Sequence, residues 1–293
     1  MKTKQSKHLL AVVLTLGIAL PVAALVPSAA IASILYAVTG DGGSPSESLF
    51  TLDQINAAEN FVLSLGNGTD GETIGYNPTD GLIYHASGHT GSDVIFESIN
   101  STFTGTTDIP IDASLQDEEA QALTWDSSRG EFLWKQNHGT GPLYSVTTGG
   151  AATLIGDMDH QAKGLGFVGN ILYSVDQGSD LLRTIDASDA STSSSIPITL
   201  AGFVVEGANG LAIRPEDSLI FAILKLSIPG AGNSRHLATI DPSTGIATDI
   251  GELSTGYAGL AFAGSVVPVP AAVWLFGTAL IGLVGFGKRR KAA

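Results

Sequence analysis

The sequence predicts an all-β domain between Ser33 and Gly264, because short strand patterns follow one another there in a fixed order. Each repeat has a strand of small and apolar residues, then an aromatic-aliphatic strand, then a strand that alternates polar with apolar residues. Turn-forming runs separate the strands, as in Asn77-Pro78-Thr79-Asp80-Gly81. Only Leu115 to Ala122 has the period of a helix, so we expect at most one helix in this interior.

Each strand of the repeat is found several times. The first strand starts at Thr73, Ala122, Gly164, Gly210 and Gly259. The second strand starts at Ile34, Gly81, Glu131, Ile171 and Leu219. The third strand starts at Ser48, Val94, Pro142, Leu181 and His236. Candidate fourth strands start at Phe61, Ala152 and Ala247, with weaker ones near Phe103 and Ile198. A period of about 40–50 residues with four short strands is typical of a β-propeller.

The repeat count predicts a closed ring of five blades. The interior begins with a second strand at Ile34 and ends with an extra first strand at Gly259, so one blade is divided between the two ends. Such closure removes the exposed sheet edges that an open array would have. A sixth blade requires hidden strands between Thr102 and Gln121, and a β-sandwich or β-solenoid is the alternative architecture. The repeats are similar in general pattern to those of NHL, YVTN and kelch propellers, without residues that assign a subtype.

Residues 1–32 have the three parts of a secretory signal peptide. Lys2, Lys4 and Lys7 precede an apolar run from Leu9 to Leu20. The segment ends with small residues at Ala30 and Ala32, and we expect cleavage after Ala32. An uncleaved anchor helix is the alternative, but the apolar run is short for a bilayer.

Residues 265–293 have the composition of a membrane-spanning segment with a stop signal. Val267-Pro268-Val269-Pro270 precedes an uncharged run from Ala271 to Phe286, and Lys288-Arg289-Arg290-Lys291 follows it. Together the motif and the run give about 20 residues, enough to cross a bilayer. The basic residues are expected to stay in the cytoplasm.

This arrangement of proline motif, apolar helix and basic end resembles the PEP-CTERM sorting signal in its VPxPAA variant. The resemblance covers Val267 to Lys291 only, and Val269 stands where glutamate is common in that family. It implies an exported protein of a Gram-negative bacterium that signal peptidase and an exosortase process. The protein would be held by its C-terminal helix in the inner membrane, transiently or permanently, and would act in the envelope, at the cell surface or in the extracellular matrix. A plain C-terminal anchor is the alternative interpretation.

The charge of the interior disfavours nucleic acid as a partner. Seven of the 14 basic residues lie in the two end segments, so the interior has seven bases against all 28 acids and a net charge of −21. Phosphate backbones are repelled by such a surface. The chain has no cysteine, which excludes disulfides, thiolate metal sites and cysteine nucleophiles. Cations, glycans or another envelope protein are the expected partners.

One face of the predicted propeller, which we call the loop face, should carry the functional side chains. It holds the connections from second to third strands and from each fourth strand to the next blade. The longer connections are predicted at 39–47, 86–93, 136–141, 176–180 and 226–235, and histidines lie in or beside the connections of this face at His85, His89, His138, His160 and His236. Our metal hypothesis, a calcium site at the mouth of the axis, takes its ligands from Asp70, Glu72, Asp157, Asp159 and His160. Solvated loop residues are the simpler interpretation, and no cofactor is otherwise indicated.

Aromatic residues at equivalent strand positions are expected in the core. These are Tyr36, Tyr84, Trp125, Trp134, Tyr144 and Tyr173, whereas Tyr76 and Tyr257 are the candidates for exposed rings that could stack on a sugar. No GxSxG elbow, phosphate loop or dinucleotide fingerprint occurs, so no catalytic residue is assigned. The sequence favours a non-enzymatic binding or structural role, with an extracellular hydrolase, lyase or lactonase and an inert spacer as the alternatives.

Overall fold

The protein is described by a computed structural model that covers residues 33–264 except 41, 67, 69, 90–92, 117, 229–231 and 255. The predicted signal peptide at 1–32 and the predicted sorting signal at 265–293 lie outside these residues. Within the described part of the chain, no helix combines the length and the apolar character needed to cross a bilayer.

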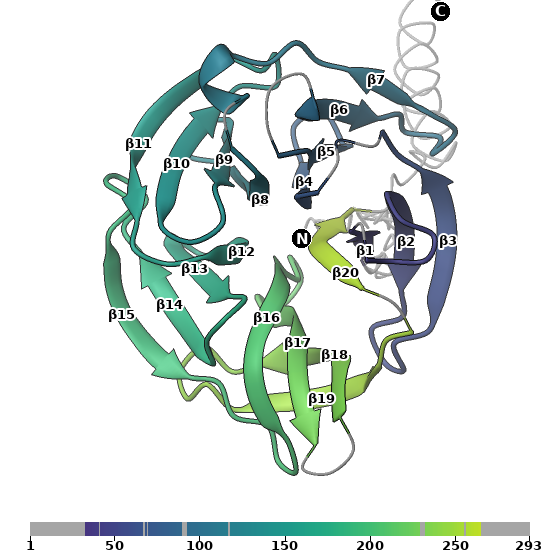
Figure 1. The fold of residues 1–293 in the computed structure, drawn as a ribbon, viewed down its shortest axis with the longest axis vertical. Coiled ribbons are helices and arrows are strands. Elements are labelled where there is room, and N and C mark those ends of the chain that lie inside the picture. The colour runs from purple at the N-terminus through teal and green to yellow at the C-terminus, as the bar shows by residue number, and fades with distance from the viewer. Residues whose placement is uncertain are drawn as a thin grey trace, which may run out of the picture. The chain divides into compact units, whose positions relative to one another are not determined.

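The described residues form five four-stranded antiparallel sheets that are arranged as the blades of a propeller ring (Figure 1). Blade 1 has the strand order β20 (Tyr257–Ala263), β1 (Ile34–Thr39), β2 (Ser48–Leu52) and β3 (Glu59–Ser64) from the axis outward. The last strand therefore pairs with the first, in a register that runs from Ile34 opposite Ala263 to Thr39 opposite Tyr257. The predicted ring of five blades with one divided blade is confirmed.

Blades 2 to 5 are each built from consecutive strands, with the first strand next to the axis. Blade 2 consists of β4 (Glu72–Asn77), β5 (Leu82–Ser87), β6 (Ile95–Ile99) and β7 (Thr106–Asp108). Blade 3 consists of β8 (Ala120–Asp126), β9 (Glu131–Gln136), β10 (Gly141–Val146) and β11 (Ala152–Met158). Blade 4 consists of β12 (Ala162–Val168), β13 (Ile171–Asp176), β14 (Leu181–Ile185) and β15 (Thr192–Pro197). Blade 5 consists of β16 (Val204–Ile213), β17 (Ile220–Ile228), β18 (Gly232–Ile240) and β19 (Ala247–Glu252).

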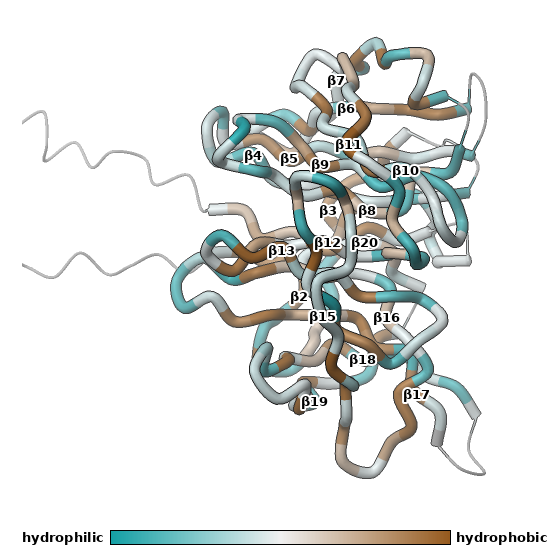
Figure 2. The backbone as a smooth tube through the Cα atoms, turned by 90° about the vertical axis from the view of Figure 1, so that its left-hand side faces the viewer, coloured by the Kyte–Doolittle hydropathy of each residue, from teal (hydrophilic) through white to brown (hydrophobic). Residues whose placement is uncertain are grey.

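The core is divided into five apolar clusters, and each lies mainly between two neighbouring blades. The cluster between blades 2 and 3, for example, packs Tyr84 and Phe96 of one blade against Phe132 and Trp134 of the next. Hydrophobic residues follow the strands and hydrophilic residues the connections (Figure 2). A sheet must bury its apolar faces against another layer. Each blade therefore depends on its two neighbours in the ring for stability.

The predicted aromatic core is confirmed for Tyr36, Tyr84, Trp134 and Tyr173, which are buried. Trp125 and Tyr144 are half-buried against the cluster between blades 2 and 3. The expectation of an exposed ring at Tyr257 is wrong, because this side chain is fully buried and its hydroxyl donates to Glu59 Oε2 at 2.7 Å. Tyr76 is half-buried at the end of the propeller axis that lies away from the loop face.

The candidate helix from Leu115 to Ala122 is also wrong. A short 3-10 turn, η2 (Ala113–Leu115), is capped by Asp112, whose carboxylate accepts from Ser114 N at 3.0 Å. Strand β8 has already begun at Ala120, whose N–H donates to Gly88 O of blade 2 at 3.0 Å. The backbone N–H and C=O groups of this segment are hydrogen-bonded to β9 and to the neighbouring blade, so they are not available for the hydrogen bonds of a helix.

Candidate functional site

A large cavity among the described residues opens on the loop face, at the mouth of the propeller axis. We call it the axial pocket, and its volume is about 800 Å³. Its walls come from blades 1, 2, 4 and 5 and from the connections between them. The lining consists of Gly40, Gly42, Ser44, Asp70, Glu72, Lys163, Gln177, Glu206, Asn209, Lys225, Asn233, Ser234, Arg235, Glu252, Leu253, Ser254, Gly256, Tyr257 and Ala258.

The innermost strands supply this pocket from equivalent positions. In each blade one residue directly precedes the start of the predicted first strand, and these five residues are Glu72, Gln121, Lys163, Asn209 and Ala258. All of them except Gln121 line the pocket. In β8, β12, β16 and β20 the pairing with the second strand is shifted at this position by a bulge. Bulges re-aim side chains at barrel rims and active sites. Four of the five blades therefore place a polar residue where an innermost strand is otherwise apolar.

The lysine of this set is neutralised within the protein. Lys163 Nζ lies 2.9 Å from Glu119 Oε1, and both side chains are more than nine-tenths buried. A second lysine nearby, Lys135, is fully buried and donates to the carbonyls of Gln136, Asn137 and Gly139. Burial lowers the pKa of Lys135 to about 8, while the charge of Glu119 partly opposes this shift.

Two polar atoms in the pocket wall have no hydrogen-bond partner among the described residues. They are Asn209 Oδ1 and Ser234 Oγ, and both are shielded from solvent. Buried polar atoms in proteins are nearly always hydrogen-bonded, and an unsatisfied one costs about 1–3 kcal/mol. The wall thus offers hydrogen-bonding capacity that a polar ligand or a bound water can take up.

A tyrosine and a glutamate fix the blade 1 side of the pocket. Glu59 accepts from Tyr257 Oη and from Ser254 Oγ at 2.7 Å each. Burial and the Glu59 carboxylate raise the pKa of Tyr257 well above its usual range. The phenol stays protonated and holds the connection from β19 to β20 in place.

The five residues of the metal hypothesis lie in three separate places. Asp70 and Glu72 line the axial pocket, and Asp70 has a left-handed backbone with φ 70°. Asp159 and His160 instead pair with each other, with His160 Nδ1 2.9 Å from Asp159 Oδ1. Asp157 lies on β11, opposite Pro142. Among the described residues, no three or more acids or histidines lie together in a way that could hold a metal ion.

His160 is positioned by contacts within blade 4. Its Nε2 lies 2.8 Å from Ser174 Oγ, and Thr192 Oγ1 donates to its partner Asp159 at 2.7 Å. Burial lowers the pKa of His160, although the hydrogen bond to Asp159 opposes this shift. This histidine packs between strands and does not line the axial pocket.

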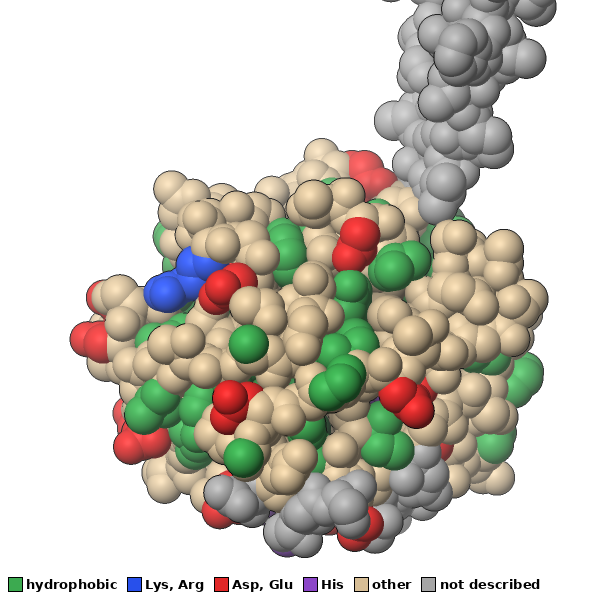
Figure 3. All heavy atoms as spheres, turned by 90° about the horizontal axis from the view of Figure 1, so that it is seen from above, with side chains coloured by type: hydrophobic (Ala, Val, Ile, Leu, Met, Phe, Trp, Pro, Cys, Tyr) green, Lys and Arg blue, Asp and Glu red, His purple; other side chains and the backbone are tan. Residues whose placement is uncertain are grey.

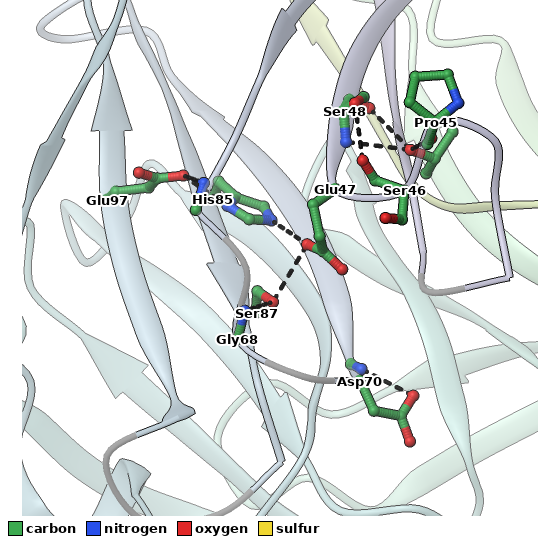
Figure 4. A network of polar contacts seen from close by, with 12 residues as sticks. Pro45, Ser46, Glu47, Ser48, Gly68, Asp70, His85, Ser87 and Glu97 are labelled. Carbon is green, nitrogen blue, oxygen red and sulfur yellow. Dashed lines mark hydrogen bonds and ion pairs between the residues drawn. The ribbon is translucent and has the colours of Figure 1, made fainter.

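The sequence did not reveal a buried carboxylate–histidine cluster between blades 1 and 2 (Figure 4). His85 lies within β5, two residues before the end of the strand, and is fully buried. Its Nδ1 is 2.9 Å from Glu97 Oε1, and its Nε2 is 3.9 Å from Glu47 Oε2. Burial opposes ionisation of Glu97, but hydrogen bonds from His85, Thr106 and Gly66 N lower its pKa. The cluster links the two blades beside the pocket.

The opposite end of the axis is apolar. A second cavity of about 360 Å³ is lined there by equivalent residues of the five innermost strands, including Tyr76, Trp125, Phe167, Ile213 and Phe262. On the side of the ring that Figure 3 shows, acidic side chains are scattered and basic side chains gather at one place. Polar chemistry near the axis is therefore concentrated at the loop face.

Comparison with known proteins gives structural similarity only. No protein-family model and no curated protein matches the sequence. Among solved structures, a nidogen/laminin complex is similar with 14% identity and a TM-score of 0.48, over 80% of this chain and 98% of that chain. A Bacteroides caccae protein of unknown function is similar with 12% identity and a TM-score of 0.49, over 79% and 99%. The Myxococcus xanthus glutaminyl cyclase is similar with 17% identity and a TM-score of 0.41, over 71% and 75%. At these values the similarities carry no functional argument, and the assignment of the fold depends on the sheet topology of this chain.

Proposed function

We propose that the protein is a non-enzymatic binding protein of the cell surface that holds a glycan in the axial pocket. The observation that carries this proposal is the pocket itself, which has a volume of about 800 Å³ and is lined mainly by hydrogen-bonding side chains. Sugars are bound through many hydroxyl contacts, and a few convergent polar groups on a rigid scaffold supply them. Asn209 Oδ1 and Ser234 Oγ are acceptors suited to such hydroxyls.

The proposed place of action follows from the two ends of the sequence. The signal peptide pattern up to Ala32 supports export, and the pattern from Val267 to Lys291 supports sorting by an exosortase. Exopolysaccharide outside the cell is the glycan that such a protein would meet first. Asp70 and Glu72 both line the pocket, and a calcium ion that paired with them would need its remaining oxygen ligands from the glycan and from water.

Calorimetric titration of the full-length protein with the host's extracellular polysaccharide tests this proposal. We expect saturable heat, and we expect Asn209→Ala to weaken binding about tenfold because one buried acceptor is lost. Asn170→Ala is the matched control, since Asn170 is exposed in a turn on the opposite face. Parallel titrations with calcium and with a chelator show whether the cation takes part. Absence of heat from the wild type would contradict glycan binding. Polysaccharide chains that are shorter after incubation with the protein would favour a hydrolase or lyase.

A further inference from the structure

Two basic residues stand directly opposite each other in the wall of the axial pocket. Lys225 of β17 and Arg235 of β18 are Cα partners in the register, so their side chains leave the sheet on the same face. Like charges at such cross-strand positions repel each other and destabilise the pair. In an interior with a net charge of −21, this pairing requires an explanation.

Neither residue has a carboxylate partner within the described residues. The other arginines there, Arg129, Arg183 and Arg214, each form an ion pair with an aspartate. Lys225 Nζ instead approaches Gln177 O at 3.4 Å, and Arg235 Nη1 donates to Tyr257 O at 3.1 Å. Burial lowers the pKa of Arg235, and no neighbouring charge contributes to this shift. Both groups are half-buried and keep unused N–H donors.

The surroundings of the pair suit a single negative group. Asn209 and Ser234, with their unsatisfied buried oxygens, belong to the same wall. Three exposed acids, Asp70, Glu206 and Glu252, and the buried Glu72 also line the pocket. These acids would repel a polyanion, whereas one anionic group on a neutral polar molecule could reach the cations. The planar fork of an arginine matches the two oxygens of a carboxylate.

We propose that Lys225 and Arg235 form the anion subsite of the axial pocket and bind the carboxylate of an acidic sugar within an otherwise neutral glycan. This inference rests on the proposed function and specifies its ligand class. A carboxylate could also reach the subsite from a small organic acid, and the experiment separates the two sources.

The test is an NMR titration of the full-length protein with three probes. Sodium glucuronate carries the sugar and the carboxylate, methyl β-glucoside carries the neutral sugar, and sodium acetate carries the carboxylate alone. We expect glucuronate to bind about tenfold more tightly than either of the other two, because only it uses both parts of the pocket. Its affinity should fall as salt is added.

Variants decide whether these two residues are responsible. Arg235→Gln and Lys225→Gln should each reduce the affinity for glucuronate about tenfold and leave the weak binding of methyl β-glucoside unchanged. Arg129→Gln, which removes a charge on the opposite face, is the control. Equal affinities for glucuronate and methyl β-glucoside, or unchanged glucuronate binding in both variants, would overturn the inference and leave glycan binding intact. Binding of acetate as tight as that of glucuronate would assign the subsite to free acids, and no binding of any probe to the wild type would count against both proposals.

Discussion

Replacing Gly150 with alanine should loosen the contact between blades 2 and 3. Gly150 ends the turn after β10 with φ +83°, and a Cβ atom there would lie 2.0 Å from Pro110 O of the neighbouring blade. The same glycine accepts a hydrogen bond from Asp112 N at 2.9 Å, which fixes its distance from that blade. The left-handed backbone costs alanine about 1–2 kcal/mol, and relief of the clash by backbone movement costs about 1–3 kcal/mol more.

Gly130→Ala is the matched control for this experiment. Gly130 has φ +69°, but a Cβ atom added there would have no neighbour within 4 Å, so alanine meets only the backbone cost. Urea unfolding of both variants, followed by tryptophan fluorescence, measures the two losses in free energy of unfolding. Gly150→Ala should lose about 1–3 kcal/mol more than Gly130→Ala. Equal losses would refute the steric argument. Gly245→Ala provides an independent check, because its Cβ would lie 2.0 Å from Pro197 O at φ +73°.

Three further predictions concern the turns, the closure of the ring and a buried lysine. Ser218 has φ 62° where three other blades have Gly81, Gly130 and Gly169 with positive φ, so Ser218→Gly should raise the free energy of unfolding by about 0.5–1 kcal/mol in urea titrations. Removal of β20 by ending the chain at Glu252 should abolish cooperative thermal unfolding in calorimetry, because β1 loses its inner partner and the ring opens. Lys135 has a pKa of about 8, below the 10.5 of an exposed lysine, so the unfolded chain binds more protons between these values and stability should rise with pH in this range, by up to about 3 kcal/mol. Lys135→Met should remove that rise from urea midpoints measured between pH 7.5 and pH 10.5, and an identical rise in both proteins would exclude Lys135 as its source.

The sequence predicted the inner strands better than the outer ones, for a physical reason. The first three strands of each blade pack on both faces, so their apolar residues give clear patterns. The fourth strands have little to bury: β7 is exposed at every residue, and β15 is mostly serine and threonine. For this reason the candidates near Phe103 and Ile198 missed the strands at Thr106–Asp108 and Thr192–Pro197 by a few residues.

The pocket was predicted only in part, because its wall departs from the repeat. Asp70 and Glu72 reach the pocket because they lie where an innermost strand begins, which the repeat pattern does predict. The predicted connection from Leu226 to Arg235 is wrong, since β17 continues to Ile228 and β18 begins at Gly232. That longer hairpin aligns Lys225 with Arg235, a pairing that only the register reveals.

Positions that repeat from blade to blade and positions that differ between blades have different roles in this chain. Repeated positions hold the packing between blades, so changes there alter stability, as at Gly150 and Gly245. The hairpin of blade 5 is longer than its counterparts in the other blades and brings Lys225 and Arg235 to the pocket wall. A substitution at a repeated position should therefore change unfolding without changing ligand affinity. A substitution at Lys225 or Arg235 should do the reverse, because each side chain makes only one hydrogen bond within the described residues and its charge acts mainly on the bound ligand.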